Sequence, residues 1–558
     1  MTPAASAVLL SPAAMIGWTL LLLAGFRGLH AAWVQQPTLS LGWKWWALVA
    51  AILLCFRWPL VWVPHQFNPD ESQLIAGAIT LRHDPVFWRS VDGSTAGPLD
   101  YYPLLPAAWG NGLASYAIAR LIGLAAVVGT GFFAGEALAI VAGTTVARLA
   151  VLPALAFHAL TTNPDFTHYS TEVMPVLLLA AAGYAAVGLG AAPSRTRLGM
   201  VGLLLGSVPW AKPQAAPLAL TLWALVALRE LAAKRPRAFI PLVAGSLLPA
   251  LVCFAGVTLT GETQHMILPF LVRNLGYVRE APLPWDDRIV LQWQNALTDG
   301  FLGLWLAGTM AFVVPALLGI RRAPESLRRV TLAAGILLAV SAWSVVAPSR
   351  PSTHHLLFLA LPLTWMAGAA LALVWPPVGA TGRSMKGLLI AGLFLACGVL
   401  PQVLWRARAG DAFAFFTTAP VRPAHRQLTE LVRRFSNPDE PIAIWGWRCS
   451  LYVEAGRRQA TRQAQSEAQI YANPLQAYFL RRYFEDFQAA NPPVFADAVG
   501  PGNFAFENRA RAHESFAPLR TWVRARYTLV ADLDGTRLYV RNDRLALREH
   551  ALPALPRP

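Results

Sequence analysis

Two carboxylates stand side by side where the chain leaves an apolar segment, in the string Asn68-Pro69-Asp70-Glu71. Ionisable groups held at a membrane face cost free energy and usually serve chemistry or transport. An ionised Asp within hydrogen-bond reach of a hydroxyl group can act as a general base. Asp70 would fall at the second helical position, near free backbone N–H groups that hold a carboxylate still. The pair marks the polar loop from about 65 to 103 as a candidate catalytic segment.

The same string has a purely structural interpretation. Asn favours the helix cap, Pro the first helical position, and acidic residues the first turn. Two further copies occur, Asn163-Pro164-Asp165 in a second polar loop and Asn437-Pro438-Asp439 in the C-terminal part. The C-terminal copy indicates that the string alone marks a turn or a cap. We favour chemistry for the first two copies because they fall in the first two loops of one face.

The second polar loop, residues 161–172, offers three further polar ligands, namely Asp165, His168 and Glu172. Two carboxylates and an imidazole could hold Mg²⁺, Mn²⁺ or Ca²⁺, or they could position an acceptor. No strict ligand spacing supports a metal. No cofactor is therefore firmly implied, and a divalent cation stays an open alternative.

Cations are expected on the same face as these acids. Lys212 lies at a tight turn between two apolar segments, and a lone ammonium group there suits a point contact to phosphate. The alternative is a Lys whose ammonium group reaches out from a span end. Arg350, His354 and His355 open a later span, and together they suit a phosphate or pyrophosphate. One imidazole of the pair is expected only to pack.

The elements that must position these residues are membrane helices. The hydrophobic fraction is 55%, the charged fraction only 14%, and mean hydropathy is +0.44. A segment of about 20 apolar residues crosses the hydrocarbon core. We expect a polytopic α-helical membrane protein with about twelve spans. They lie near 7–26, 45–63, 115–140, 143–160, 173–190, 199–211, 214–231, 238–259, 301–320, 330–347, 355–375 and 387–405.

Orientation follows from Lys and Arg in the short loops, which favour the cytoplasm. Because successive spans cross the membrane in opposite directions, the loops near 195, 235, 325 and 385 fall on one side, which is the cytoplasmic side. The opposite, extracytoplasmic side then holds loop 65–103, loop 161–172, Lys212 and everything after about 406. The net charge of +16 therefore needs no nucleic-acid partner.

The chain is expected to have two domains, a transmembrane catalytic domain over 1–405 and an extracytoplasmic α/β domain over 406–558. Charge rises and apolar runs shorten in the second domain. Amphipathic or apolar periodicity predicts its elements: helices over 422–435 and 473–488, strands over 441–447 and 492–499, and a hairpin around Asp534-Gly535.

These motifs resemble the C-fold glycosyltransferases (GT-C), in the glycosyltransferase family 39 group. That group includes protein O-mannosyltransferases and lipid A aminoarabinose transferases. The resemblance covers about 45–405 and, more loosely, the tail. Four features carry it: Asp70-Glu71 in the first outer loop, Asp165 in the second, Lys212-Pro213, and Arg350 with His354-His355 at the start of a late span.

The resemblance implies an inverting membrane glycosyltransferase that acts outside the cytoplasm, expected in a bacterial inner membrane. Its donor would be a polyprenyl-phosphate sugar, and its acceptor a glycan, a lipid or a protein. Asp70 would be the catalytic base with Glu71 its partner, while Lys212, Arg350, His354 and His355 would hold the donor phosphate.

One departure concerns the first loop. The aminoarabinose transferases carry a Lys late in that loop, whereas residues 90–103 here contain none. Arg82 or Arg89 would then substitute, or the phosphate is held differently.

Two other functions fit the same pattern. Many spans would suit a transporter or flippase of lipid-linked glycans, although the carboxylates lie in loops and no repeated half is visible. A polymerase or ligase of lipid-linked glycans would use the same kind of donor without needing an outer Asp-Glu pair.

Overall fold

Apolar helices make up most of the chain, as its composition predicts. The structure, a computed structural model, describes residues 12–34, 40–190, 192–277, 283–348, 352–375, 384–409 and 422–549. Within these residues nine helices are long and apolar enough to cross a membrane, and two shorter apolar helices accompany them. The chain is therefore a polytopic α-helical membrane protein.

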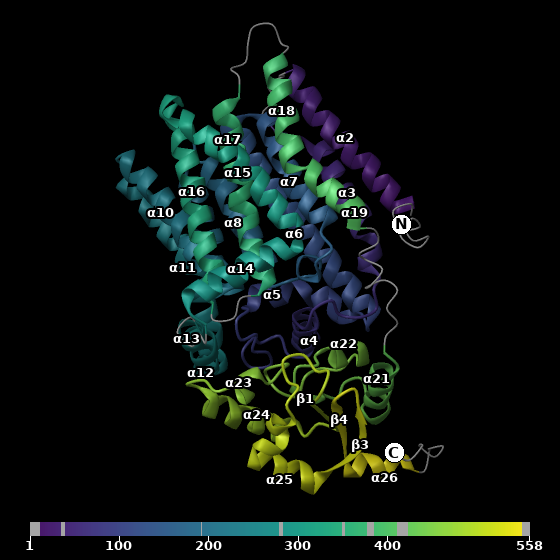
Figure 1. Cartoon of the computed structure of the whole chain (residues 1–558). Coiled ribbons are helices and arrows are strands. Elements are labelled where there is room, and N and C mark those ends of the chain that lie inside the picture. The colour runs from purple at the N-terminus through teal and green to yellow at the C-terminus, as the bar shows by residue number, and fades with distance from the viewer. Residues whose placement is uncertain are drawn as a thin grey trace. The chain divides into compact units, whose positions relative to one another are not determined.

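The chain divides into two compact units, and the first comprises residues 1–61, 121–255 and 277–417. It is a bundle of helices (Figure 1) around one large core of Leu, Ala, Phe and Trp side chains. Its helices are α2 (Pro12–Val34), α3 (Trp43–Val61), most of α6 (Leu113–Ala142), α7 (Thr144–Leu160), α8 (Val173–Val187), α9 (Arg195–Ala211), α10 (Ala216–Ala232), most of α11 (Phe239–Thr260), α14 (Trp285–Asp299), α15 (Phe301–Gly319), α16 (Glu325–Val346), α17 (Ala360–Val374), α18 (Met385–Gly398) and α19 (Leu400–Ala409).

Eleven of the twelve predicted spans fall on the nine long and two shorter apolar helices, whereas the predicted span 199–211 falls on α9, which is not among them. The first span also differs at its end. We expected the first span to end near residue 26, before Arg27, but α2 continues to Val34 and includes Arg27 and His30. A long basic side chain near a helix end can extend toward the interface, so it need not terminate the helix.

The second unit comprises residues 62–120, 256–276 and 418–558. It joins the first polar loop and a later loop to the C-terminal segment. Its helices are α4 (Pro69–His83), α5 (Pro98–Tyr101), η1 (Tyr102–Trp109), α12 (Thr263–Met266), η5 (Ile267–Val272), most of α13 (Arg273–Tyr277), α21 (Pro423–Phe435), α22 (Ser450–Ala455), α23 (Glu467–Ile470), α24 (Gln476–Ala490), α25 (Ala517–Arg526) and α26 (Asn542–Glu549).

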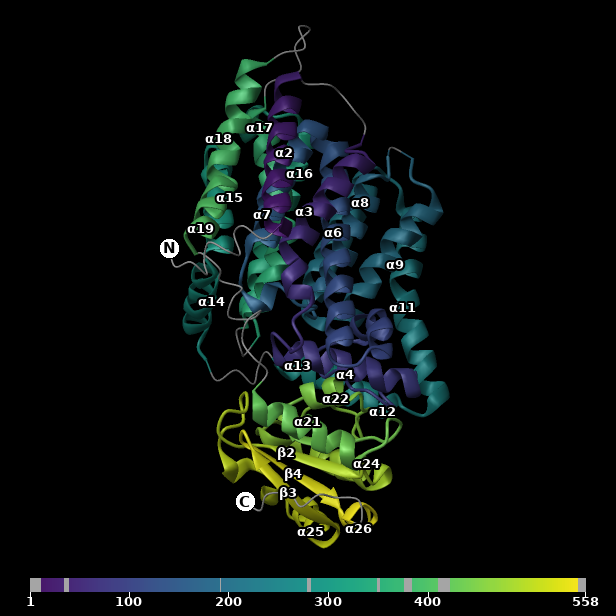
Figure 2. The same ribbon diagram turned by 90° about the vertical axis from the view of Figure 1, so that its right-hand side faces the viewer.

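A four-stranded sheet forms the centre of the C-terminal segment (Figure 2). The strands are β1 (Ala443–Gly446), β2 (Val494–Ala498), β3 (Tyr527–Leu533) and β4 (Thr536–Arg541), in the order β1-β2-β4-β3. β1 and β2 are parallel, as two strands joined through helices should be, and the other pairs are antiparallel. The predicted hairpin is confirmed: Asp534 and Gly535 both have positive φ, as a two-residue type I′ turn requires.

Candidate active site

The first candidate cluster lies in the second unit, at the start of α4. Asn68 has extended backbone angles, and its side-chain oxygen accepts a hydrogen bond from the backbone N–H of Asp70 at 2.9 Å. Pro69 occupies the first helical position, where it loses no helical hydrogen bond. The half-buried Asp70 therefore stands at the second position of α4, as predicted.

Glu71 is held in a buried ion pair. Its side chain accepts from Arg120 Nε at 2.7 Å and Nη2 at 3.0 Å, and from the backbone N–H of Phe67 at 2.9 Å. Arg120 also donates to the carbonyls of Val63 and His65 and lies 3.8 Å from the centroid of the Phe67 ring. Glu71 and Arg120 thus fix the segment before α4, which leaves Asp70 as the better base candidate of the pair.

Arg120 is a residue that the sequence interpretation missed. It lies in the apolar helix α6 and is only 3% exposed. An Arg inside an apolar helix is itself a signal of a functional or structural partner. The signal could not identify that partner, because Glu71 is 49 residues away in the sequence.

The two arginines proposed as substitutes for a loop Lys lie at or beyond the far end of α4. Arg82 is twelve positions after Asp70, about 18 Å along a helix axis, and donates to the carbonyl of Ala108 at 3.2 Å. Arg89 forms two hydrogen bonds with Asp84. Both guanidinium groups therefore already have hydrogen-bond partners within the protein. A phosphate-binding role for Arg82 or Arg89 stays a prediction.

The second candidate cluster lies in the first unit and is built on the loop after α7. Thr161 donates to a carboxylate oxygen of Asp299 at 2.8 Å, which fixes the start of the loop. The buried Arg57 donates to the carbonyls of His158 and Phe166. Arg57 and Asp299 were also missed by sequence interpretation, because both lie far along the chain from the loop that they hold.

The loop ends at Glu172, which forms a buried ion pair with Lys212. The ammonium group of Lys212 donates to Glu172 Oε1 and to Thr171 Oγ1. Lys212 lies between α9 and the 3₁₀ turn η3 (Pro213–Ala215), so the tight turn predicted between two spans directs it inward. Glu172 and Lys212 are 0% and 3% exposed. Lys212 is therefore an interior cation and does not reach toward the membrane surface.

The imidazoles of His354 and His355 complete this cluster. Both are buried in the 3₁₀ helix η7 (Thr353–Leu359), with ring centroids 4.9 Å apart. His354 lies 4.0 Å from a carboxylate oxygen of Asp165 and 4.0 Å from one of Glu172. The structure thus brings together five residues that the sequence had singled out separately, from the second loop, the Lys212 turn and the late span.

Two other predicted residues do not join the described cluster. His168 is buried and its Nδ1 lies 2.8 Å from the carbonyl of Tyr169, which is a packing role. Arg350 lies outside the described residues.

The Lys212 ammonium group sets this cluster apart from an ordinary metal site. Burial opposes ionisation of Glu172, but Lys212 and the two imidazoles outweigh it and hold the pKa of the carboxyl group below its usual range. Glu172, His354 and His355 have ligand atoms within 4.8 Å of one another, but the Lys212 ammonium already occupies Oε1 of the same carboxylate. A divalent ion would have to approach the Lys212 ammonium group, whereas a phosphate would meet that group and two imidazoles beside the carboxylates of Glu172 and Asp165.

Within the described residues, the buried polar atoms of the cluster that make no hydrogen bond include Oε2 of Glu172 and Nδ1 of His355. Buried polar atoms are nearly always bonded to protein or water. One acceptor and one imidazole nitrogen are therefore available to a polar ligand, and Lys212 has a third N–H beyond the two that it uses.

Comparison with known proteins identifies the fold. No protein-family model and no curated protein matches the chain. The structure of ArnT from Cupriavidus metallidurans bound to undecaprenyl phosphate is similar, at 12% identity over 89% of this chain and 98% of that one, with a TM-score of 0.59. The chain has the GT-C fold. The apo structure of the same ArnT is also similar, at 12% identity over 89% and 97% of the two chains, with a TM-score of 0.53.

At 12% sequence identity, the structural similarity shows the GT-C fold but does not show the activity. A fold can carry several functions, so the activity has to be argued from the residues of the site. Two clusters of this chain, one at the start of α4 and one around Glu172 and Lys212, offer such residues.

Proposed function

We propose that the chain is a membrane glycosyltransferase that moves a sugar from a polyprenyl-phosphate donor to a glycan, lipid or protein acceptor. The observation that carries this proposal is the buried Lys212 cluster at the end of an apolar helix bundle. A lipid-phosphate sugar combines a long apolar chain with an anionic phosphate. The apolar helices of this bundle offer a surface for the chain, and the Lys212 cluster offers a cation for the phosphate. The similar ArnT structure contains undecaprenyl phosphate, which supports a donor of this class.

Asp70 serves the acceptor in this proposal. Its carboxylate takes the proton of the acceptor hydroxyl group while the oxygen attacks the anomeric carbon of the sugar. The bond between that carbon and the phosphate oxygen breaks, and its electron pair leaves with the polyprenyl phosphate. Attack from the side opposite the leaving group inverts the anomeric configuration. Glu71 and Arg120 act by holding the segment from which α4 starts.

Lys212 serves the donor. Negative charge grows on the phosphate oxygen as the bond breaks, and a fixed cation there stabilises the transition state. His354 and His355 add donors to the same anion, and Glu172 keeps the ammonium group in place. We place the transfer on the extracytoplasmic side of a bacterial inner membrane, because the short basic loops belong to the other side.

The test is donor turnover by the purified full-length chain in lipid nanodiscs. A panel of polyprenyl-phosphate sugars is supplied with candidate acceptors, and mass spectrometry measures the released polyprenyl phosphate, a product common to all such donors. Asp70→Asn keeps the shape and the cap of α4 but removes the base, so we expect at least a ~100-fold loss of rate.

The third copy of the string provides the matched control. Asn437-Pro438-Asp439 forms a turn in the C-terminal segment, and Asp439→Asn should leave the rate unchanged. Full activity of Asp70→Asn would remove the base assignment. No release from any donor, together with lipid movement that survives Asp70→Asn, would favour a flippase instead.

A further inference from the structure

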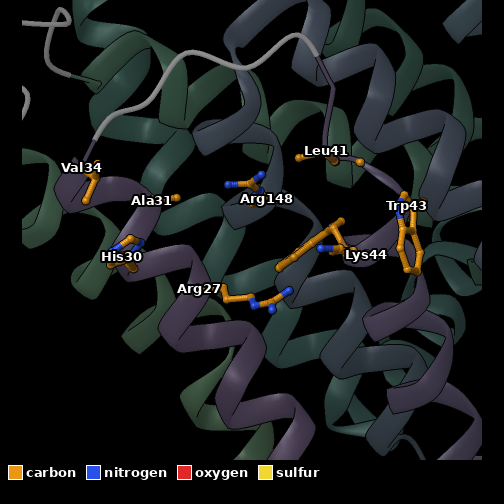
Figure 3. A pocket seen from close by; sticks show the side chains of 10 residues that line it. Arg27, His30, Ala31, Val34, Leu41, Trp43, Lys44 and Arg148 are labelled. Carbon is orange, nitrogen blue, oxygen red and sulfur yellow. The ribbon is translucent and has the colours of Figure 1, made fainter.

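A basic pocket lies in the first unit, where α2, α3 and α7 meet. Its volume is about 430 Å³, and its lining includes Arg27 and His30 of α2, Lys44 at the start of α3, and Arg148 near the start of α7. Figure 3 shows the Arg27, Lys44 and Arg148 side chains directed toward one common space, with His30 beside them. Three basic side chains thus surround a cavity of suitable size for a phosphate-bearing headgroup.

No acidic residue balances these cations within the lining. In the part of the chain that the structure describes, no salt bridge reaches Arg27, Lys44 or Arg148. The acid that acts on Arg148 is Glu136, and its Oε1 already accepts from Trp46 and from the backbone of Leu41. Gathering like charges is unfavourable, so the cavity is best suited to an anion.

The surroundings of the pocket are those of a membrane interface. On α2, Leu22, Leu23 and Phe26 precede Arg27 and are all exposed. Trp43 is 75% exposed, and its ring faces the Lys44 ammonium group at 5.9 Å. Exposed apolar side chains followed by Trp, Lys and Arg at the helix ends are the pattern of residues that contact acyl chains and headgroups together.

The pocket is separate from the Lys212 cluster. Arg148 lies near the first residue of α7, whereas the loop that carries Glu172 follows its last residue. A helix of 17 residues is about 25 Å long. The two anion-binding clusters therefore lie at opposite ends of the same helix, and the pocket belongs to the end that carries the short basic loops.

We propose that Arg27, Lys44 and Arg148, assisted by His30, bind the phosphate group of an anionic lipid in the leaflet opposite the Lys212 cluster. The phosphate sits between the three cations, and the acyl chains lie along Leu22, Leu23 and Phe26. The site does not depend on glycosyl transfer, and it holds whether or not the proposed reaction is correct.

Native mass spectrometry of the full-length protein with defined lipids tests the proposal. The variant Arg27→Gln/Lys44→Gln/Arg148→Gln removes the pocket charges, and the control Arg195→Gln/Arg328→Gln/Lys386→Gln removes three exposed cations at the same end. We expect the wild type and the control to retain phosphatidylglycerol over phosphatidylcholine. The pocket variant should lose this preference at least tenfold. Arg27→Gln alone, on an exposed side chain, should give a smaller loss in the same direction without disturbing the packing.

Equal retention of phosphatidylglycerol by the pocket variant and the wild type would overturn the site. Inorganic phosphate separates the two sources of the anion. A lipid site should resist displacement by millimolar phosphate, because the acyl contacts add to the affinity. Full displacement by phosphate, with no preference for lipid, would overturn the lipid assignment and point to a soluble phosphate compound.

Discussion

Arg120 and Glu71 form a buried ion pair with two contacts, in which Nε and Nη2 of Arg120 meet the two oxygens of Glu71 at 2.7 and 3.0 Å. Both side chains are almost fully buried, and the pair joins the start of α4 to α6. The acid next to the proposed base therefore has a structural partner of its own. This relationship separates the roles of two adjacent carboxylates that the sequence could not tell apart.

Removal of Glu71 should destabilise the protein strongly. Glu71→Ala leaves a buried guanidinium group without its counter-ion, which costs roughly 3–5 kcal/mol of unfolding free energy. Glu71→Leu/Arg120→Met should recover most of that loss. Glu325→Ala breaks an exposed pair with Arg329 and should cost about 1 kcal/mol or less. Denaturant titration checks all three, and equal losses for Glu71→Ala and Glu325→Ala would contradict the assignment.

Lys212 has a structural and a functional effect that two variants can separate. Lys212→Ala should lower stability because Glu172 is left buried and unpaired, and it should also abolish donor use. Lys212→Met/Glu172→Gln removes both charges, so thermal stability should return while donor turnover stays absent. Lys386→Ala, at an exposed position, should affect neither. A double variant that turns over donor at the wild-type rate would exclude Lys212 from the phosphate site.

A divalent ion should not be required by the second cluster, because Lys212 already occupies Glu172. We expect EDTA to leave the melting temperature unchanged and donor turnover unaffected. Addition of millimolar Mn²⁺ should likewise not raise the melting temperature. A stabilisation by Mn²⁺ that disappears in Glu172→Gln would show instead that Glu172, His354 and His355 hold a metal.

Stability should fall between pH 6.5 and 4 through His265. Burial, followed by the charges of Arg462 and Arg482, lowers the pKa of His265 from 6.5 to about 4. Between these two pKa values, His265 is protonated in the unfolded chain and neutral in the folded chain. The contribution of His265 to the unfolding free energy is therefore fully present above about pH 6.5 and declines as the pH falls. Nδ1 of His265 lies 2.7 Å from the Tyr478 hydroxyl group, and His265→Asn keeps a polar partner there without titrating. Melting temperatures of this variant should depend less on pH in that window, and an identical profile would exclude His265.

The C-terminal segment should lie outside the cytoplasm. The loops with Arg195, Arg235, Arg328 and Lys386 carry the basic residues that favour the cytoplasmic side. A single span, Met385–Arg408, follows the last of these loops and takes the chain to the opposite side. A C-terminal fusion to alkaline phosphatase should be active, and a fluorescent-protein fusion should be dark. Bright fluorescence at this end would reverse the whole orientation.

Local signals accounted for the parts of the fold that could be predicted. Asn68 and Pro69 determine where α4 starts, and Asp534-Gly535 determines the hairpin, because each acts on backbone groups within three residues. Long apolar runs predicted the spans because the hydropathy of about 20 consecutive residues decides whether a helix can cross the membrane. The first span was expected near 7–26, but α2 ends at Val34, and its residue Arg27 lines the basic pocket.

Only some residues of the candidate site could be predicted from the sequence. Residue types and loop positions were enough to single out Glu172, Lys212 and His354, since loops on one face can meet. Arg57, Arg120 and Asp299 were missed because the groups that they hold lie tens of residues away or more. Such pairings depend on how the helices pack, and no local pattern encodes that packing.

The tight turn between α9 and α10 has a thermodynamic consequence for any ligand of Lys212. A free Lys side chain loses on the order of 2 kcal/mol of rotamer freedom when it is immobilised. Here Glu172 and Thr171 already hold the ammonium group, so this entropy is lost during folding rather than during binding. A bound anion meets a cation that is already ordered, and its dissociation constant should include little contribution from arranging that side chain.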